Sequence, residues 1–214
     1  MLKVYHQFFL YDKNNKLIKK TRKRKSRSFL KQFLQIFYGF CYAVNTIKDI
    51  VGSNRTIGGY TGYLGGAFHF NSYNTGGSIC YSLSPYSHFQ ITSCNGGIIV
   101  GISNQAVAIT DNALITPILH GTTTGTLEYL GSSVKSLTIN AGTNTATFNV
   151  ERLFRNSSGN NIDIQEVGLY STAEGESNYQ YVWMFCILRD IVSPAFTVAN
   201  GEYLKATYTF SITA

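Results

Sequence analysis

A run of basic residues near the N-terminus is the part of the sequence best suited by residue type and spacing to bind a charged partner. Seven of the nine residues from Lys19 to Arg27 are positively charged. Such a strip can neutralise phosphates, and the affinity that it contributes falls with salt. It can also bind an acidic face of a neighbouring subunit, or lie on an anionic membrane beside an amphipathic helix. The candidate docking residues are Lys19, Lys20, Arg22, Lys23, Arg24, Lys25 and Arg27.

The charge of the chain is divided unevenly between its ends. Residues 1–31 hold eleven basic side chains and one acidic side chain, a balance of +10. The remaining 183 of the 214 residues hold seven basic and ten acidic groups, a balance of −3, and the sum is the net charge of +7. This division predicts a basic arm on a mildly acidic body. An arm of one copy can therefore bind the body of another.

Side chains with catalytic or metal-binding potential are scattered. The histidines show neither the HxH nor the HxxxH spacing of metal ligands, and they are His6, His69, His88 and His120. Asp163 and Glu166 lie three residues apart on a predicted strand, so they point to opposite faces, and the sequence gives no sign of a carboxylate pair. The GxSxG motif is absent, and the four cysteines include no CxxC pair. We therefore expect no enzyme activity, no catalytic or metal-binding residues, no cofactor and no disulfide framework.

One helical period is clear, and it follows the basic run. Ser26 or Ser28 can cap a helix that we expect from about residue 28 to residue 43. Its aromatic stripe consists of Phe29, Phe33, Phe37 and Phe40. This stripe serves either as the core face of the domain's own helix or as an interface with a partner. The apolar stretch is too short and too polar to span a bilayer, so we expect no stable membrane insertion.

Strand patterns dominate the rest of the chain. Residues 2–11, a turn at 12–16 and a return strand at 17–18 predict a hairpin. In the last strand, Leu204, Ala206, Tyr208, Phe210 and Ile212 share one face. Between them, short β-rich runs alternate with Gly, Asn, Ser and Thr clusters. The expected strands are 68–70, 78–82, 89–92, 98–102, 126–130, 136–139, 145–154, 163–170, 181–190 and 203–212.

These elements predict a mainly β protein. Short strands at intervals of about ten residues favour an antiparallel β-sandwich of jelly-roll-like type. The sandwich is preceded by a basic N-terminal arm and one N-terminal amphipathic helix. We expect residues 1–45 to hold the arm, hairpin and helix, and residues 46–214 to form the β-sandwich domain.

Two stretches, residues 98–130 and 152–212, contain a series of short motifs. They include Gly97–Gly101, Ala106–Leu114, His120–Thr122, Leu127–Tyr129, Arg155–Gly159, Ile164–Tyr170, Leu188–Val192, Val198–Gly201 and Thr207–Thr209. The series resembles a pattern in uncharacterised β-sandwich virion proteins of tailed bacteriophages. Lys25–Leu30 is similar to the segment before that family's helix, and Glu166–Tyr170 to an element of tail-fibre and collar proteins. The resemblance covers most of the chain and implies a capsid-associated, connector, tail or fibre protein.

The segment Glu166–Tyr170 also has a physical interpretation. We expect Val167 and Leu169 to face the core, while Gly168 permits a close neighbour or a bulge. Glu166 is then expected to face outward, where it can contact a basic partner.

Together, these features predict a non-catalytic structural component of a virus particle, located in the virion. We expect it to self-associate and to dock through its basic arm on capsid, portal or tail proteins, with packaged nucleic acid as a second partner. Two alternatives stay open. One is a carbohydrate- or receptor-binding module of a tail fibre or spike, with tyrosine-rich loops at 71–77 and 176–180 that stack on sugars. The other is a protein that binds nucleic acid through the arm alone.

Overall fold

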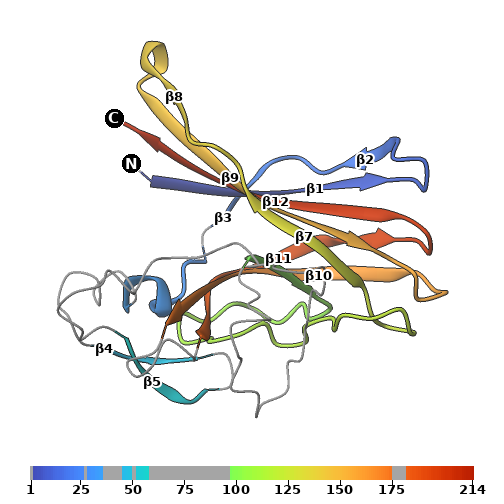
Figure 1. The fold of residues 1–214 in the computed structure, drawn as a ribbon, viewed down its shortest axis with the longest axis horizontal. Helices are drawn as coiled ribbons and strands as arrows, with labels where there is room; N and C mark the ends of the chain where they lie inside the picture. The colour runs from blue at the N-terminus through green and yellow to red at the C-terminus, as the bar shows by residue number, and fades with distance from the viewer. Residues whose placement is uncertain (1, 27, 36–44, 50–51, 58–96, 175–181) are drawn as a thin grey trace.

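The computed structural model of the chain describes residues 2–26, 28–35, 45–49, 52–57, 97–174 and 182–214 (Figure 1). Most of these residues lie in β-strands, and all the pairings between strands are antiparallel. Helical structure among the described residues is limited to residues 31–35 and a short 3-10 turn, η2 (Ala141–Thr143). The prediction of a mainly β, antiparallel protein is confirmed.

The larger sheet, sheet A, brings the two ends of the chain side by side. Its strands follow the order β2–β1–β12–β9–β7, with β3 also paired to β1 and β8 to β9. Their bounds are β1 (Leu2–Tyr11), β2 (Leu17–Lys20), β3 (Arg24–Ser26), β7 (Glu128–Val134), β8 (Thr138–Asn140), β9 (Thr145–Arg155) and β12 (Tyr203–Thr213).

The second sheet, sheet B, has the order β11–β10–β6. Its strands are β6 (Gly97–Gly101), β10 (Ile162–Glu174) and β11 (Val182–Val198), and a separate hairpin joins β4 (Asn45–Lys48) to β5 (Asn54–Ile57). The strands expected at 98–102, 126–130, 136–139, 145–154, 163–170, 181–190 and 203–212 correspond to β6–β12. Those expected at 68–70, 78–82 and 89–92 lie outside the described residues.

Alternating side chains give sheet A one core face. On β12, Leu204, Ala206 and Tyr208 are no more than 1% exposed, whereas Lys205 between them is half-buried on the other face. Residues two apart on a strand point to the same side, so the apolar set collects on one face. The predicted shared face of β12 is therefore confirmed.

Sheets A and B face each other across a common core (Figure 1). The rings of Phe8 on β1 and Phe196 on β11 stack with their centroids 5.6 Å apart. The Tyr208 hydroxyl of sheet A donates to the Val167 carbonyl of sheet B, over 3.3 Å. These contacts bury aromatic surface from both layers, which is the main source of stability in such a fold.

The predicted hairpin is present, but it is not part of a separate arm. β1 pairs with β12 along ten consecutive residue pairs, and Val4, Phe8 and Leu10 of β1 lie in the core. The expected boundary at residue 45 is therefore wrong for β1, which belongs to the β body. The sequence suggested a separate arm because the dense positive charge of residues 13–27 is typical of an arm, whereas the pairing of residues 2–11 with a distant strand leaves no local signal.

The chain then crosses from one sheet to the other. β3 pairs with β1 in sheet A, and residues 28–30 follow the free edge of β11 in sheet B. Phe29 pairs with Leu188, while the Leu30 amide donates to the Ile187 carbonyl over 3.0 Å. This strap joins the edges of both layers.

The strap also corrects the predicted start of the helix. Residues 28–30 are extended, and the described helical residues are 31–35. Pairing with β11 satisfies backbone groups that a helix beginning at residue 28 would have to cap. The rest of the expected helix, from residue 36 to residue 43, lies outside the described residues.

Candidate functional site

The basic strip forms the lysine-rich edge of sheet A. β2 pairs with residues 9–11 of β1 and β3 with residues 4–6, and between them the Thr21 amide donates to the Phe8 carbonyl over 3.0 Å. The described charged residues of the strip, from Lys19 to Lys25, are all exposed. Arg27 lies outside the described residues. The strip thus follows the edge of sheet A through backbone pairing with β1.

The strand register divides the strip between two faces. Lys19 is opposite the buried Leu10, and its Nζ lies 5.0 Å from the centre of the Phe196 ring. Arg24 is opposite the buried His6, and its guanidinium donates to the Ser193 carbonyl of β11. Lys19 and Arg24 lie at the side of the core between the two sheets. Both already contact β11, Lys19 through the Phe196 ring and Arg24 through the Ser193 carbonyl.

The other lysines lie on the outer face of sheet A. Lys20 is opposite Phe9, Lys25 is opposite Tyr5, and the Nζ of Lys23 lies 5.0 Å from the centre of the Tyr5 ring. The outer face is completed by Lys3 and by Lys205, whose Nζ lies 4.8 Å from the centre of the Phe9 ring. We call this set the cationic face: Lys3, Lys20, Lys23, Lys25 and Lys205.

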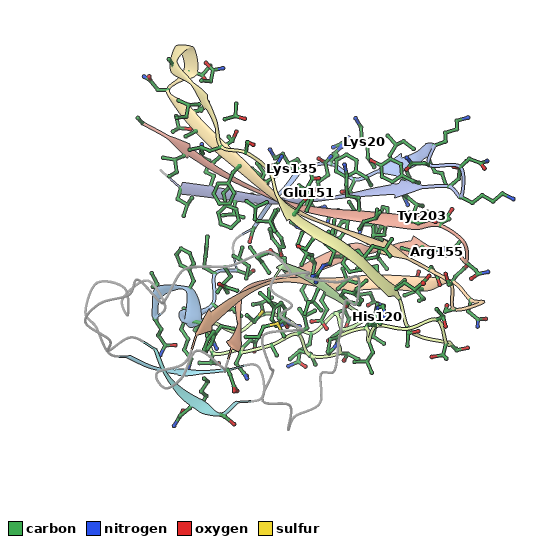
Figure 2. All side chains as sticks on the ribbon, in the orientation of Figure 1. Lys20, His120, Lys135, Glu151, Arg155 and Tyr203 are labelled. Carbon is green, nitrogen blue, oxygen red and sulfur yellow. The ribbon has the colours of Figure 1, made fainter. Side chains whose placement is uncertain are left out.

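The cationic face has no counter-charge among the described residues. None of its five lysines is within salt-bridge distance of a described acidic side chain. Further across sheet A the charges are balanced, since Lys135 lies 3.8 Å from Glu151 and Arg155 lies 3.7 Å from Glu128. Figure 2 shows Lys20 on β2 and the Lys135–Glu151 pair further along sheet A. The unbalanced charge is therefore concentrated over β1, β2, β3 and β12.

Two roles fit lysines in this position. Lysines on an edge strand prevent pairing with the edge of another sheet, and this role needs no partner. A group of five uncompensated cations also attracts an acidic surface. Lys205 lies on β12, an interior strand of sheet A, and edge protection does not explain a lysine there.

The aromatic stripe is only partly described. Phe29 and Phe33 have ring centroids 4.6 Å apart, and both pack against the core cluster while staying partly exposed. These two residues therefore contribute to the domain's own core, which is one of the two roles that the sequence allowed. Phe37 and Phe40 lie outside the described residues.

The prediction that Glu166 faces outward is wrong. Its side chain is fully buried, and Oε2 accepts from Arg189 Nε over 2.9 Å. Its carboxylate also accepts from the backbone amides of Thr116 over 2.8 Å and Ile115 over 3.2 Å. Strand alternation suggested exposure, but β10 is covered on both faces, by sheet A and by the long connection between β6 and β7.

Arg189 fastens that connection to sheet B. It is fully buried, and its Nη1 lies 2.9 Å from Asp111 Oδ2 while Nη2 donates to the Gln105 carbonyl over 2.9 Å. Asp111 and Gln105 both lie between β6 and β7, and Glu166 joins the same guanidinium. Every charged group in the network is paired with another, so the network holds the connection between β6 and β7 against β10 and β11.

The neighbours of Glu166 match their predicted places. Val167 and Leu169 are buried in the core. A Cβ at Gly168 would lie 2.9 Å from a Tyr170 ring carbon and 3.2 Å from the Leu188 carbonyl oxygen. The close neighbour that we expected at Gly168 is therefore present.

Buried His6 gives the fold a pH dependence. Burial lowers the pKa of His6; the carboxylate of Asp190 on β11 opposes this and the Arg24 cation adds to it. Because the pKa is lower in the folded state, protons bind more readily to the unfolded chain. The stability that neutral His6 contributes is therefore fully present above about pH 6.5, and it is lost as the pH falls below that value.

We expect the wild type to lose more unfolding free energy between pH 7 and pH 5 than His6→Met, by at most about 1.4 kcal/mol per pH unit. Urea titrations at both pH values measure the difference, and equal losses would contradict it.

Two other side chains of reactive type lie among the described residues, the Cys186 thiol and the His120 imidazole. Burial raises the pKa of Cys186 to about 12, so this thiol stays protonated and acts as a small apolar side chain. Exposed His120 accepts a hydrogen bond from the Tyr129 amide over 3.0 Å. In the described part of the chain, no cluster of His, Cys, Asp or Glu could hold a metal ion, and no helix is long and apolar enough to cross a membrane. The predicted sugar-stacking loops at 71–77 and 176–180 are not among the described residues.

Comparison of the chain with protein-family models, curated proteins and solved structures finds no match. The similarity to virion proteins of tailed bacteriophages thus stays a prediction from the sequence motifs.

Proposed function

We propose that this chain is a non-catalytic structural component of a virus particle that self-associates and docks on acidic faces of neighbouring virion proteins. The observation that carries the proposal is the cationic face, with five lysines and no described salt-bridge partner. The resemblance to virion proteins of tailed bacteriophages supports the location, and we further propose that sheets A and B form a jelly-roll-like sandwich.

The mechanism of docking is electrostatic complementarity on a rigid surface. The lysines of β1, β3 and β12 are fixed by strand pairing, so little backbone entropy is lost when a partner binds. Rings beneath Lys23 and Lys205 hold these ammonium groups by cation–π contact. An acidic partner surface therefore meets preorganised charges, and its binding weakens as salt increases.

Charge reversal on the cationic face tests the proposal. In particles of the virus that encodes the chain, we expect Lys20→Glu/Lys25→Glu to lower the incorporated amount at least about tenfold, because acidic partner groups are repelled. Quantitative mass spectrometry of purified particles measures the amount. The control Lys13→Glu/Lys16→Glu changes the net charge equally at the exposed β1–β2 turn and should leave incorporation within about twofold of the wild type. Absence of the wild-type chain from particles, or equal loss in both variants, would reject the proposal.

Nucleic acid is the second candidate partner, because Tyr5, Phe9 and Tyr11 are interleaved with the lysines. Proteins that bind single strands combine such cations with rings on which bases stack. Lysine groups already occupy one side of these rings, so we favour an acidic protein. A salt titration with a labelled single-stranded oligonucleotide separates the two, since phosphate binding gives a steep dependence of log K on log salt.

A further inference from the structure

Sheet A extends past its core at the end that holds β8. The strand register places Leu2 opposite Ile212, Ile212 opposite Ala146, and Ala146 opposite Ile139. These four residues form one row across β1, β12, β9 and β8, and we call it the apolar row. Figure 1 shows β8 and the adjacent ends of β9 and β12 projecting from the body.

The apolar row continues the core face, and none of the described residues covers it. Leu2 is 42% exposed, Ile212 is 53% exposed and Ile139 is 72% exposed. The next residues on the same face, Val4 and Phe210, are 1% and 6% exposed. Residues two apart on a strand share a face, so the core surface of sheet A runs outward into solvent at this end.

This end of the sheet also lacks charge. Residues 136–149 and 206–214 contain no charged side chain. The nearest lysines are Lys135, which is paired with Glu151, and Lys3, which alternates with Leu2 and so lies on the other face. In a chain of net charge +7, an uncharged apolar end contrasts with the lysine-rich edge at β2 and β3.

The missing charge indicates which partner covers the row. A two-fold contact pairs the same surface patch on both copies, so a patch with charges of one sign would face charges of that same sign. A partner of a different kind requires no such neutrality. The apolar row avoids this self-repulsion and gains from removal of exposed Leu and Ile from water.

We propose that the apolar row is a self-association surface, on which a second copy of this chain packs its own apolar row face to face. This inference deepens the self-association in the proposed function and assigns it to one end of sheet A. Because the row is short, the contact is weak in isolation and is reinforced when copies are held together in an assembly.

Analytical ultracentrifugation of the full chain from about 5 to 200 µM tests the assignment. We expect the wild type to show a concentration-dependent dimer, and Ile139→Lys to raise the dimer dissociation constant at least about tenfold. Ile139 is mostly exposed, so this variant keeps its fold, which circular dichroism and thermal unfolding check. The matched control is Thr138→Lys, because Thr138 is also exposed but is on the opposite face of β8.

A wild type that stays monomeric throughout this range would overturn the assignment, and so would an Ile139→Lys variant that dimerises as well as the wild type. Equal loss of dimer in Ile139→Lys and Thr138→Lys would overturn the face-to-face geometry. The measurement uses no virus particle, so its failure is distinct from a failure of the particle-incorporation test.

Discussion

Replacement of Arg189 by alanine is expected to lower the free energy of unfolding by about 3–5 kcal/mol, the cost of removing one partner from a buried ion pair. Arg189 and Glu166 are both fully buried, with 2.9 Å between Nε and Oε2. Without the guanidinium, Glu166 keeps two backbone amide donors among the described residues, those of Ile115 and Thr116. Asp111 loses its ionic partner as well, so the connection between β6 and β7 loses its contacts with Arg189 and keeps its backbone bonds to β6 and β10.

Arg155→Ala is the matched control, because Arg155 also pairs with a glutamate. Its Nη1 lies 3.7 Å from Glu128 Oε2, but the arginine side chain is 46% exposed. Solvent screens such a pair, and its loss is expected to cost about 1 kcal/mol or less. Chemical denaturation of both variants gives the comparison. If Arg189→Ala lowers the free energy of unfolding no more than Arg155→Ala does, the buried network does not stabilise the fold as its geometry indicates.

Strand alternation explains which parts of the fold could be predicted. On β12, apolar residues at every second position predicted the core face of Leu204 to Phe210. The hairpin of β1 and β2 was predictable from β-forming residues around a polar turn, in which Asp12 accepts from the amides of Asn14 and Lys16. Both signals are local, so neither requires knowledge of the distant pairing partner.

Glu166 shows where a local pattern fails. Alternation distinguishes two faces of a strand, but it does not reveal that both faces of β10 are covered. A second signal was present in Arg189, which lies in the long apolar run of β11. A buried guanidinium needs a buried acid, and Glu166 supplies it from the neighbouring strand, where Val167 is opposite Asp190 and Gly168 is opposite Arg189.

Composition identified the basic strip, but the division of its side chains between the two faces of sheet A could not be predicted. Lys19 and Lys20 are adjacent in sequence, yet one lies over Phe196 at the side of the core and the other shares the outer face with Phe9. The register with β1 determines this division, and a one-residue slip would exchange the two faces. Lys205 joins the cationic face from a distant strand, so no local run of charge could identify it.

Replacement of Phe8 by alanine is expected to destabilise the whole protein by about 3–5 kcal/mol, the usual cost of truncating a buried phenylalanine. Phe8 is 2% exposed and stacks on Phe196 of the opposite sheet. Truncation removes this contact between the sheets and leaves a cavity between β1 and β11. The loss should appear as a single cooperative shift in urea unfolding, monitored by circular dichroism.

The adjacent residue provides the control. Phe9 lies on the outer face beneath Lys205, and Phe9→Ala removes mainly a cation–π contact worth about 0.5–1 kcal/mol at an exposed site. If residues 2–11 were a detachable arm, neither variant would change the unfolding of the body. If Phe8→Ala loses much more unfolding free energy than Phe9→Ala, then β1 is a core strand in the register described. Equal effects would contradict that register, and with it the placement of lysines on the cationic face.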